Sequence, residues 1–450
     1  MTPGASIWES IRTSFWFVPA VLSAGAAALA IGLLVLDVSL DSSAVKGLAV
    51  VYLGGADGAR SLLSTLAGSL ATVIGVAFSV TIVSLQLASS QFGPRILRTF
   101  IRDRGNQAVL GTLVATFVYC LLVLRSVRGG DGVARGFVPH IAVTGGVLLG
   151  FVSVAMLIYF IHHLSVSIQA DRVVAAVAHD LEHATTALYP EPLGAGERLE
   201  HAHVPAVPAA MQERAHEVTA STSGYLQMVD AERMLAIATE ADLIVRVEQS
   251  PGDFVMPGTP LALVWPAERG SGPLDKRLRR AFVLGEERTL VQDLRFGVHQ
   301  LTEIAVRALS TSLNDPFTAL TCLDRLAAAL AHVGTRRTPS PYRYDEGGRL
   351  RVIATPLTMD ALVTTALDPI RRYGGGNPRI LRKLLDVVIL VGDRSPRQDL
   401  RAALLEQAHL VERAARETLS EPEARADIAE RFLMAQRRLA AAPAGAREAA

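Results

Sequence analysis

The chain has little of several residue types that often mark a function. It contains two cysteines, Cys120 and Cys322, so far apart that we expect no disulfide framework. Lysine occurs only as Lys46, Lys276 and Lys383, and none follows a glycine, so the Gly-Lys pair of a P-loop is absent. The net charge of +1 gives no bulk attraction to nucleic acid, and we expect no nucleic-acid partner.

The sequence also lacks the tripeptide period of collagen, the long polar tracts of disordered chains and a repeat at solenoid spacing. Apolar residues are abundant instead: they make up half of the 450 residues, and the mean hydropathy is +0.32. Charge is unevenly spread, because residues 1–170 hold ten Lys and Arg against six Asp and Glu, and the rest hold 34 against 37. A lightly basic apolar part therefore precedes a slightly acidic one.

Four uncharged apolar stretches occur in the first 165 residues. They cover residues 15–36, 62–87, 108–124 and 140–160. As helices, stretches of this length can cross a hydrocarbon core of about 30 Å. Buried soluble helices are the alternative, but four such runs in one region favour an α-helical membrane domain over residues 1–165.

An even number of spans puts both ends of this domain on one side of the membrane. Arg95, Arg98, Arg102 and Arg104 lie between the second and third spans, and each opposite loop carries fewer basic residues. Cytoplasmic loops are enriched in arginine and lysine. We therefore predict a multi-pass protein of the bacterial inner (plasma) membrane with both termini cytoplasmic and the lipid bilayer as its first partner.

Small and polar residues recur in the second span at steps of three, four or seven, which places them on one helical face. They are Ser64, Gly68, Thr72, Gly75, Ser79, Gln86 and Ser90. Such residues allow close helix packing in lipid. The other interpretation is a pore lining in a homo-oligomer, since weakly polar walls conduct ions without trapping them.

Charge near the second span bears on both interpretations. Arg95, Arg98 and Arg102, which follow this span, would favour anions at a pore mouth or would hold phospholipid head groups. No Asp, Glu, Lys or Arg lies inside the four runs. This absence disfavours a pump with an intramembrane carboxylate.

Six distinctive strings are spread over most of the chain. They are FSVTIVSLQLASSQFGPRILR (78–98), DRGNQ (103–107), FVYC (117–120), FIHH (160–163), GDFV (252–255) and LNDPFTA (313–319). With them the sequence resembles a bacterial family of integral membrane proteins catalogued as a domain of unknown function. The resemblance implies several spans followed by a large soluble portion, and it implies no catalytic residue.

The part after the spans is predicted to be a cytoplasmic α+β region. Its expected sections are a connecting helix and loop (166–205), a small β module (206–268), a helical segment (269–335), a mostly helical segment (336–439) and a flexible tail (440–450). Asp315 and Pro316 form a helix start signal, because aspartate caps a helix and proline suits its first turn. Residues 351–354 predict a short strand.

The turn over residues 251–260 resembles the hairpins of lipoyl- and biotinyl-carrier domains, which are small β barrels. A carrier domain needs a lysine that can be acylated, and no lysine lies in 206–268. We therefore expect a barrel-like module without a covalent cofactor, and no cofactor elsewhere.

Candidate chemistry is sparse. His179 and His183 are four residues apart on an expected helix and could share a metal ion, but no third ligand is specified, and a polar helix face is the alternative. His216 and Glu217 begin like a zinc-protease helix, yet Ala220 occupies the second histidine position.

A charged helical stretch begins with Asp293 and Arg295. Within it His299, Glu303 and Arg307 share one face, which could contact a ligand or another subunit, or could be ordinary charge pairing.

These patterns favour an oligomeric channel or transport-related membrane protein with a cytoplasmic regulatory domain. A membrane-anchored sensor or scaffold without transport is the second hypothesis. A membrane-surface enzyme is the third, and it would need the histidine pair or the His299 face as its site. We found no catalytic motif.

Overall fold

The computed structural model describes residues 16–39, 52, 54–93, 103–129, 137–167, 169–189, 211, 214–354 and 357–441. The chain divides into two compact units, Met1–Arg172 and Val173–Ala450. Arg95, Arg98 and Arg102 lie outside the described residues, as does the predicted tail beyond residue 441.

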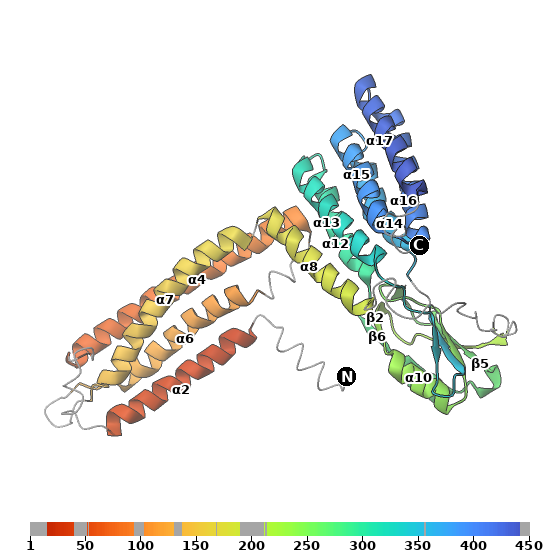
Figure 1. The fold of residues 1–450 in the computed structure, drawn as a ribbon. Coiled ribbons are helices and arrows are strands. Elements are labelled where there is room, and N and C mark those ends of the chain that lie inside the picture. The colour runs from red at the N-terminus through yellow and green to blue at the C-terminus, as the bar shows by residue number, and fades with distance from the viewer. Residues whose placement is uncertain are drawn as a thin grey trace, which may run out of the picture. The chain divides into compact units, whose positions relative to one another are not determined.

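The first unit contains four long helices (Figure 1). They are α2 (Phe17–Ser39), α4 (Ala56–Phe92), α6 (Arg104–Ser126) and α7 (His140–Ser167). All four are long and apolar enough to cross a membrane, which confirms the four predicted stretches as helices. Each helix is longer than the uncharged run that predicted it, because polar residues continue the helix at its ends.

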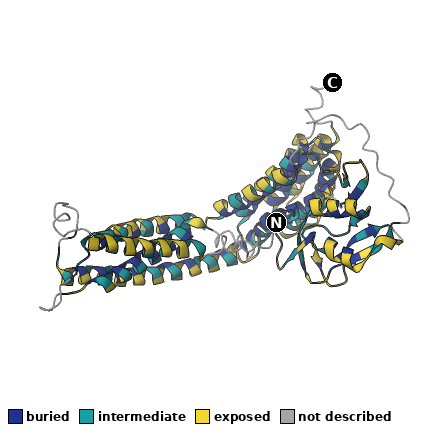
Figure 2. Cartoon of the chain, turned by 90° about the horizontal axis from the view of Figure 1, so that it is seen from below, coloured by how far each residue is buried: buried dark blue, intermediate teal, exposed yellow. Residues whose placement is uncertain are grey.

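Helix α6 packs against α2, α4 and α7, and most extensively against α2. Its Leu113 and Tyr119 are fully buried, and the Tyr119 hydroxyl donates a hydrogen bond to the Ala142 carbonyl of α7 at 2.7 Å. A Cβ atom at Gly111 would lie 3.1 Å from the Pro19 backbone, so glycine permits the close approach of α6 to α2. Figure 2 shows that the helices of the bundle keep broad exposed faces.

Polar contacts tie helices together at both ends of the bundle. The Asp37 carboxylate, near the end of α2, accepts from the N–H groups of Ile141 (3.0 Å) and Ala142 (2.8 Å) in the first turn of α7. At the other end, His163 of α7 contacts Asp103, which caps α6. The start of α2 and the end of α7 are therefore at the same end of the bundle, as an even number of spans requires.

The second unit begins along α8 (Ala170–Leu188) and continues into two β sheets. The five-stranded sheet has the order β1-β5-β3-β8-β7, and the three-stranded sheet has the order β4-β2-β6. The strands are β1 (His216–Thr219), β2 (Gly224–Val229), β3 (Ile244–Val247), β4 (Phe254–Val255), β5 (Pro260–Trp265), β6 (Phe282–Gly285), β7 (Tyr342–Tyr344) and β8 (Leu350–Ile353). All pairs are antiparallel except β3 with β8, which are parallel.

This arrangement changes the expected β module. The strand predicted near residue 351 is confirmed as β8, but it joins the same sheet as β3, and Val352 shares one buried core with Val245 and Leu261. The module is thus not limited to 206–268, and a closed barrel is not confirmed. Three short helices belong to this region: α10 (Ala231–Glu240), η2 (Ala267–Arg269) and α11 (Gly272–Arg279). We did not predict α10, whose buried Met234, Ile237 and Ala238 have helical spacing.

Six helices complete the second unit: α12 (Leu294–Ala308), α13 (Pro316–Gly334), α14 (Met359–Gly374), α15 (Pro378–Arg394), α16 (Gln398–Thr418) and α17 (Pro422–Ala440). The predicted start of α13 is confirmed, since the Asp315 side chain accepts from the Thr318 N–H and Pro316 is the first helical residue.

The six helices pack as three stacked hairpins, α12–α13, α14–α15 and α16–α17 (Figure 1). Helices α12, α14 and α16 form one row and α13, α15 and α17 the other, as in a short solenoid. The sequence analysis found no repeat at solenoid spacing, and the stacked hairpins are a feature of the structure that it did not predict. Successive hairpins start 65 and 39 residues apart because β7 and β8 intervene once, so the sequence has no constant period.

Candidate functional site

The α4 face predicted from the sequence is exposed along its whole length. Ser64, Gly68, Thr72, Gly75, Ser79, Gln86 and Ser90 are all exposed in the first unit. At about 100° per residue they fall within about 80° of the helix circumference. The buried residues of α4, which include Leu63, Leu70 and Thr81, lie on the opposite side. The face therefore does not pack within its own bundle.

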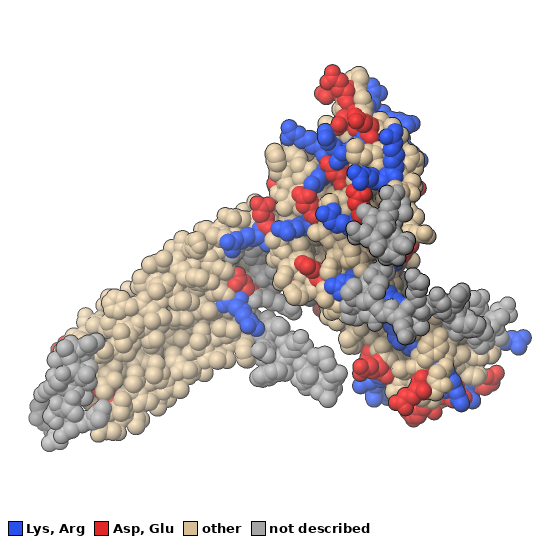
Figure 3. All heavy atoms as spheres, viewed as in Figure 1, with Lys and Arg blue, Asp and Glu red and all other residues tan. Residues whose placement is uncertain are grey.

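Three hydroxyl groups of this face make hydrogen bonds within α4. The hydroxyls of Ser64, Thr72 and Ser90 donate to the carbonyl oxygens of Ser61 (3.0 Å), Gly68 (3.2 Å) and Leu87 (2.9 Å), all on α4 itself. A Cβ atom at Gly68 or at Gly75 would meet nothing within 4 Å. The face is thus open and weakly polar, and most of its side chains are small. In Figure 3 the visible surface of the bundle is uncharged over most of its length.

The second predicted face lies on α12. Arg307 approaches Glu303 to 3.3 Å, and these two side chains and His299 are partly buried. The ion pair follows the i, i+4 pattern of ordinary charge pairing, one of the two alternatives considered from the sequence. A ligand or subunit role for this face stays a prediction.

The histidine pair lies on α8. Nε2 of His179 and Nε2 of His183 are 3.0 Å apart, and both residues are exposed. Among the described residues, no group of three or more His, Cys, Asp or Glu side chains is arranged to hold a metal ion. The structure thus brings the two imidazoles together and adds no third ligand from the described part of the chain. His216, the other histidine considered, contacts Asp275 at 2.8 Å.

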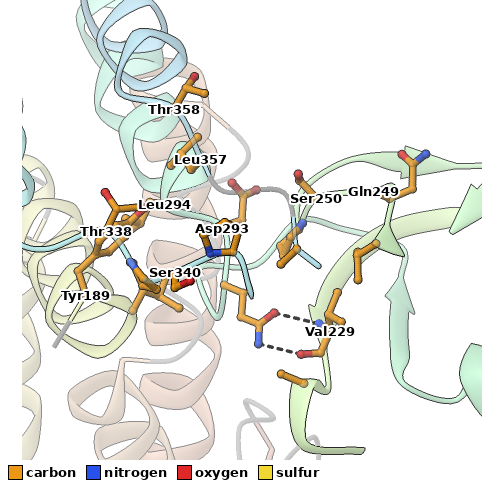
Figure 4. Close-up of a pocket in the computed structure, with 18 of the residues that line it drawn as sticks. Tyr189, Val229, Gln249, Ser250, Asp293, Leu294, Thr338, Ser340, Leu357 and Thr358 are labelled. Atoms are coloured by element: carbon orange, nitrogen blue, oxygen red, sulfur yellow. Dashed lines mark hydrogen bonds between the residues drawn. The ribbon is translucent and has the colours of Figure 1, made fainter. Parts of the chain in front are cut away.

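The structure adds a site that the sequence did not predict, a cavity of about 450 Å³ within the second unit (Figure 4). It lies beside the first turns of α10, α12 and α14 and the end of α8, and the segment 338–343 closes another side. Asp293 and Arg295 were noted in the sequence as the start of a charged stretch. Their role in a cavity depends on residues from segments far apart in the chain.

Asp293 lines this cavity and contacts several neighbouring groups. Its side chain is 1% exposed, caps α12 through the Phe296 N–H, and contacts Arg288 at 2.7 Å and Arg295 at 3.9 Å. Burial raises the pKa of Asp293, and the neighbouring Arg288 and Arg295 oppose that rise. A Cβ atom at Gly252 would fall 2.1 Å from Oδ2 of Asp293, so the Gly252 turn fits against this carboxylate.

Arg295 links the same turn to α12. Its guanidinium contacts the Asp253 carboxylate at 3.0 Å, and Asp253 also accepts from the Ser250 N–H at 2.8 Å. Two residues of the string GDFV, which carried part of the family resemblance, thus contact Asp293 and Arg295.

The four-helix bundle and the attached α+β unit define a class of protein: a multi-pass membrane protein with a large extramembrane portion. The chain matches the family described as "Predicted membrane protein (DUF2254)" over residues 12–389. It belongs to that family, and the resemblance inferred from the six strings is confirmed. The family description establishes a membrane protein and assigns no function.

Curated relatives support the same assignment. The chain is 36% identical over 386 residues to an uncharacterized protein of Mycobacterium bovis, and the match covers 84% of this chain and 72% of the relative. Two uncharacterized proteins of Mycobacterium tuberculosis strains match with the same identity and coverage. No solved structure matches the chain significantly.

Proposed function

We propose that this protein is a homo-oligomeric channel or transport-related protein of the bacterial inner membrane, in which the α4 face lines the path. The observation that carries the proposal is the exposure of all seven residues of that face. In contact with lipid, glycines and hydroxyls gain nothing that larger apolar residues would not provide. Around a symmetry axis they leave space, and hydroxyl oxygens replace part of the hydration of a permeating ion.

The proposed orientation places both termini and the second unit in the cytoplasm. It has a direct test in two variants that each add one cysteine at an end of α4, Asp57→Cys and Gln91→Cys. Both positions are exposed and both native cysteines are buried, so background labelling should be low. An impermeant thiol reagent added to intact cells should label Asp57→Cys and not Gln91→Cys. The reverse pattern would invert the topology.

The transport proposal is tested by flux into proteoliposomes. Ser79→Leu puts a bulky side chain on the proposed path and should block flux, whereas Val76→Leu is the matched control. Val76 is 59% exposed on the same helix, but it lies outside the seven-residue face. Size-exclusion profiles should be unchanged in both variants. Loss of the oligomer in Ser79→Leu alone would instead identify the face as a packing surface.

Selectivity gives a second measurement on the same proposal. Arg95 and Arg98 follow α4 in sequence and would concentrate anions at the cytoplasmic mouth. Arg95→Glu should then shift the permeability ratio toward cations. Absence of wild-type flux for common ions under voltage, tension or pH steps would contradict the transport proposal.

A sensor or scaffold without transport is the second candidate. The cavity beside Asp293 supports it, because a concave site of this size suits a small ligand. Ligand binding by the second unit, together with zero flux, would favour this candidate.

A further inference from the structure

The cavity in the second unit combines an apolar wall with a small number of polar groups. Val247, Leu294 and Leu357 are among the apolar residues that line it (Figure 4). Its volume of about 450 Å³ falls within the range of small-molecule sites, about 300–1,000 Å³. The wall therefore suits a ligand with an apolar body.

Tyr189 supplies an unused hydrogen-bond donor at this cavity. The residue is 6% exposed, and among the described residues its hydroxyl has no hydrogen-bond partner. Burial raises the pKa of Tyr189, with Arg397 opposing the rise, so the phenol keeps its proton at neutral pH. The hydroxyl can therefore donate to an acceptor oxygen of a ligand within the cavity.

Arg343 supplies positive charge at the same cavity. Its guanidinium donates to the carbonyl oxygens of Ser340 and Tyr342, and no carboxylate of the described residues lies within ion-pair distance. The Asp293 carboxylate also lines the cavity, but its negative charge is compensated by Arg288, which contacts it at 2.7 Å. Asp293 therefore repels a bound anion only weakly. Two helices, α12 and α14, also begin at the cavity, and their N-terminal dipoles favour negative charge.

We propose that this cavity binds a small carboxylic acid with an apolar body. The Arg343 guanidinium pairs with the carboxylate, the Tyr189 hydroxyl donates to a ligand oxygen, and Val247, Leu294 and Leu357 contact the body. The site requires no metal and no covalent step. It is independent of the α4 face, so its test does not depend on transport.

The test is calorimetric titration of the full-length protein in dodecyl maltoside. The probes are octanoate and 3-phenylpropionate, each compared with its uncharged alcohol, octan-1-ol and 3-phenylpropan-1-ol. At least one acid should bind with a dissociation constant below about 1 mM, and its alcohol at least about tenfold more weakly. Whether octanoate or 3-phenylpropionate binds more tightly shows whether the cavity prefers an aliphatic or an aromatic ligand. No acid binding at that concentration, or equal binding of acid and alcohol, would overturn the proposal.

Variants identify the groups that bind. Arg343→Gln should weaken acid binding about tenfold or more, and Tyr189→Phe about threefold to tenfold. Arg349→Gln is the matched control, because Arg349 lies 73% exposed in the turn between β7 and β8 and does not line the cavity. Equal affinity of wild type and Arg343→Gln would overturn the assignment.

A filling variant provides a check that does not depend on charge. Ala361 lines the cavity, and Ala361→Phe should abolish binding of both acids. Thermal unfolding of every variant without ligand should show a folded protein. Binding that persists in a folded Ala361→Phe variant would place the ligand elsewhere and overturn the proposal.

Discussion

Nε2 of His163 lies 2.6 Å from Oδ2 of Asp103, which joins the last turns of α7 to the residue that caps α6. Both side chains are about three-quarters buried. The other oxygen of Asp103 accepts from the Gly105 N–H at 2.7 Å. One carboxylate therefore serves a helix cap and an interhelical contact together. The string DRGNQ begins with this residue, and FIHH ends with its partner.

Substitutions at this pair should separate its two roles. Asp103→Ala should lower stability by about 1–2 kcal/mol, because it removes both the cap and the contact. Asp103→Asn keeps an acceptor for the cap and should lower stability by less than Asp103→Ala. Thermal unfolding in detergent measures both, with Asp57→Asn, a fully exposed position, as the control. Equal loss in Asp103→Asn and Asp57→Asn would show that the contact contributes nothing.

Gly252 should tolerate alanine poorly. Its φ of +97° favours glycine, and a Cβ atom there would collide with Asp293. Gly258→Ala is the matched control, since Gly258 has a φ of +90° with open space around it. We expect Gly258→Ala to lower the free energy of unfolding by about 1–2 kcal/mol through backbone strain alone. Gly252→Ala should lower it by more. Urea unfolding, monitored by tryptophan fluorescence, measures the difference. Identical losses of stability in the two variants would contradict the close approach of Gly252 to Asp293.

Arg401 should be required by the last helical hairpin. Its buried guanidinium on α16 donates to the carbonyl oxygens of Gly392, Arg438, Leu439 and Ala441, which lie at or near the ends of α15 and α17. Arg401→Met leaves these acceptors unpaired and should destabilise the protein by about 3 kcal/mol. Urea unfolding is again the measurement. Arg413→Met, at an exposed position of the same helix, should change stability little, and equal effects would refute the capping role.

The junction of α10, β3 and β8 should weaken in acid. Hydrogen bonds from Arg269 and Arg351 hold the pKa of Asp242 at about 2, below its usual value of about 3.9. A lowered pKa stabilises the folded state above the unfolded value, and this stabilisation is lost as pH falls from about 4 to about 2.

The measurement is the unfolding temperature of wild type and Asp242→Asn across this pH window. The wild-type temperature should fall more steeply than that of Asp242→Asn, which has no carboxylate to protonate at this position. Parallel curves for the two proteins would show that Asp242 is not responsible.

Local sequence was sufficient for several elements of the fold. The four spans followed from uncharged runs, because a charge inside a hydrocarbon core is costly. The start of α13 followed from Asp315 and Pro316, whose effects act within one helical turn. The stacked helical hairpins could not be predicted from local sequence. The segment between α13 and α14 forms β7 and β8, and these strands join the sheet of a distant strand, β3. That pairing depends on a shared buried core, which no local pattern records.

The same division holds for the candidate sites. The periodicity of Ser64, Gly68, Thr72, Gly75 and Ser79 determined by itself that they share one face of α4, because helical geometry is fixed at 3.6 residues per turn. Only the tertiary structure decided that this face is turned away from the bundle, since α6 packs against the opposite side. The cavity was decided by tertiary structure alone. Tyr189 and Arg343 are 154 residues apart, and packing within the second unit brings them to the walls of one cavity.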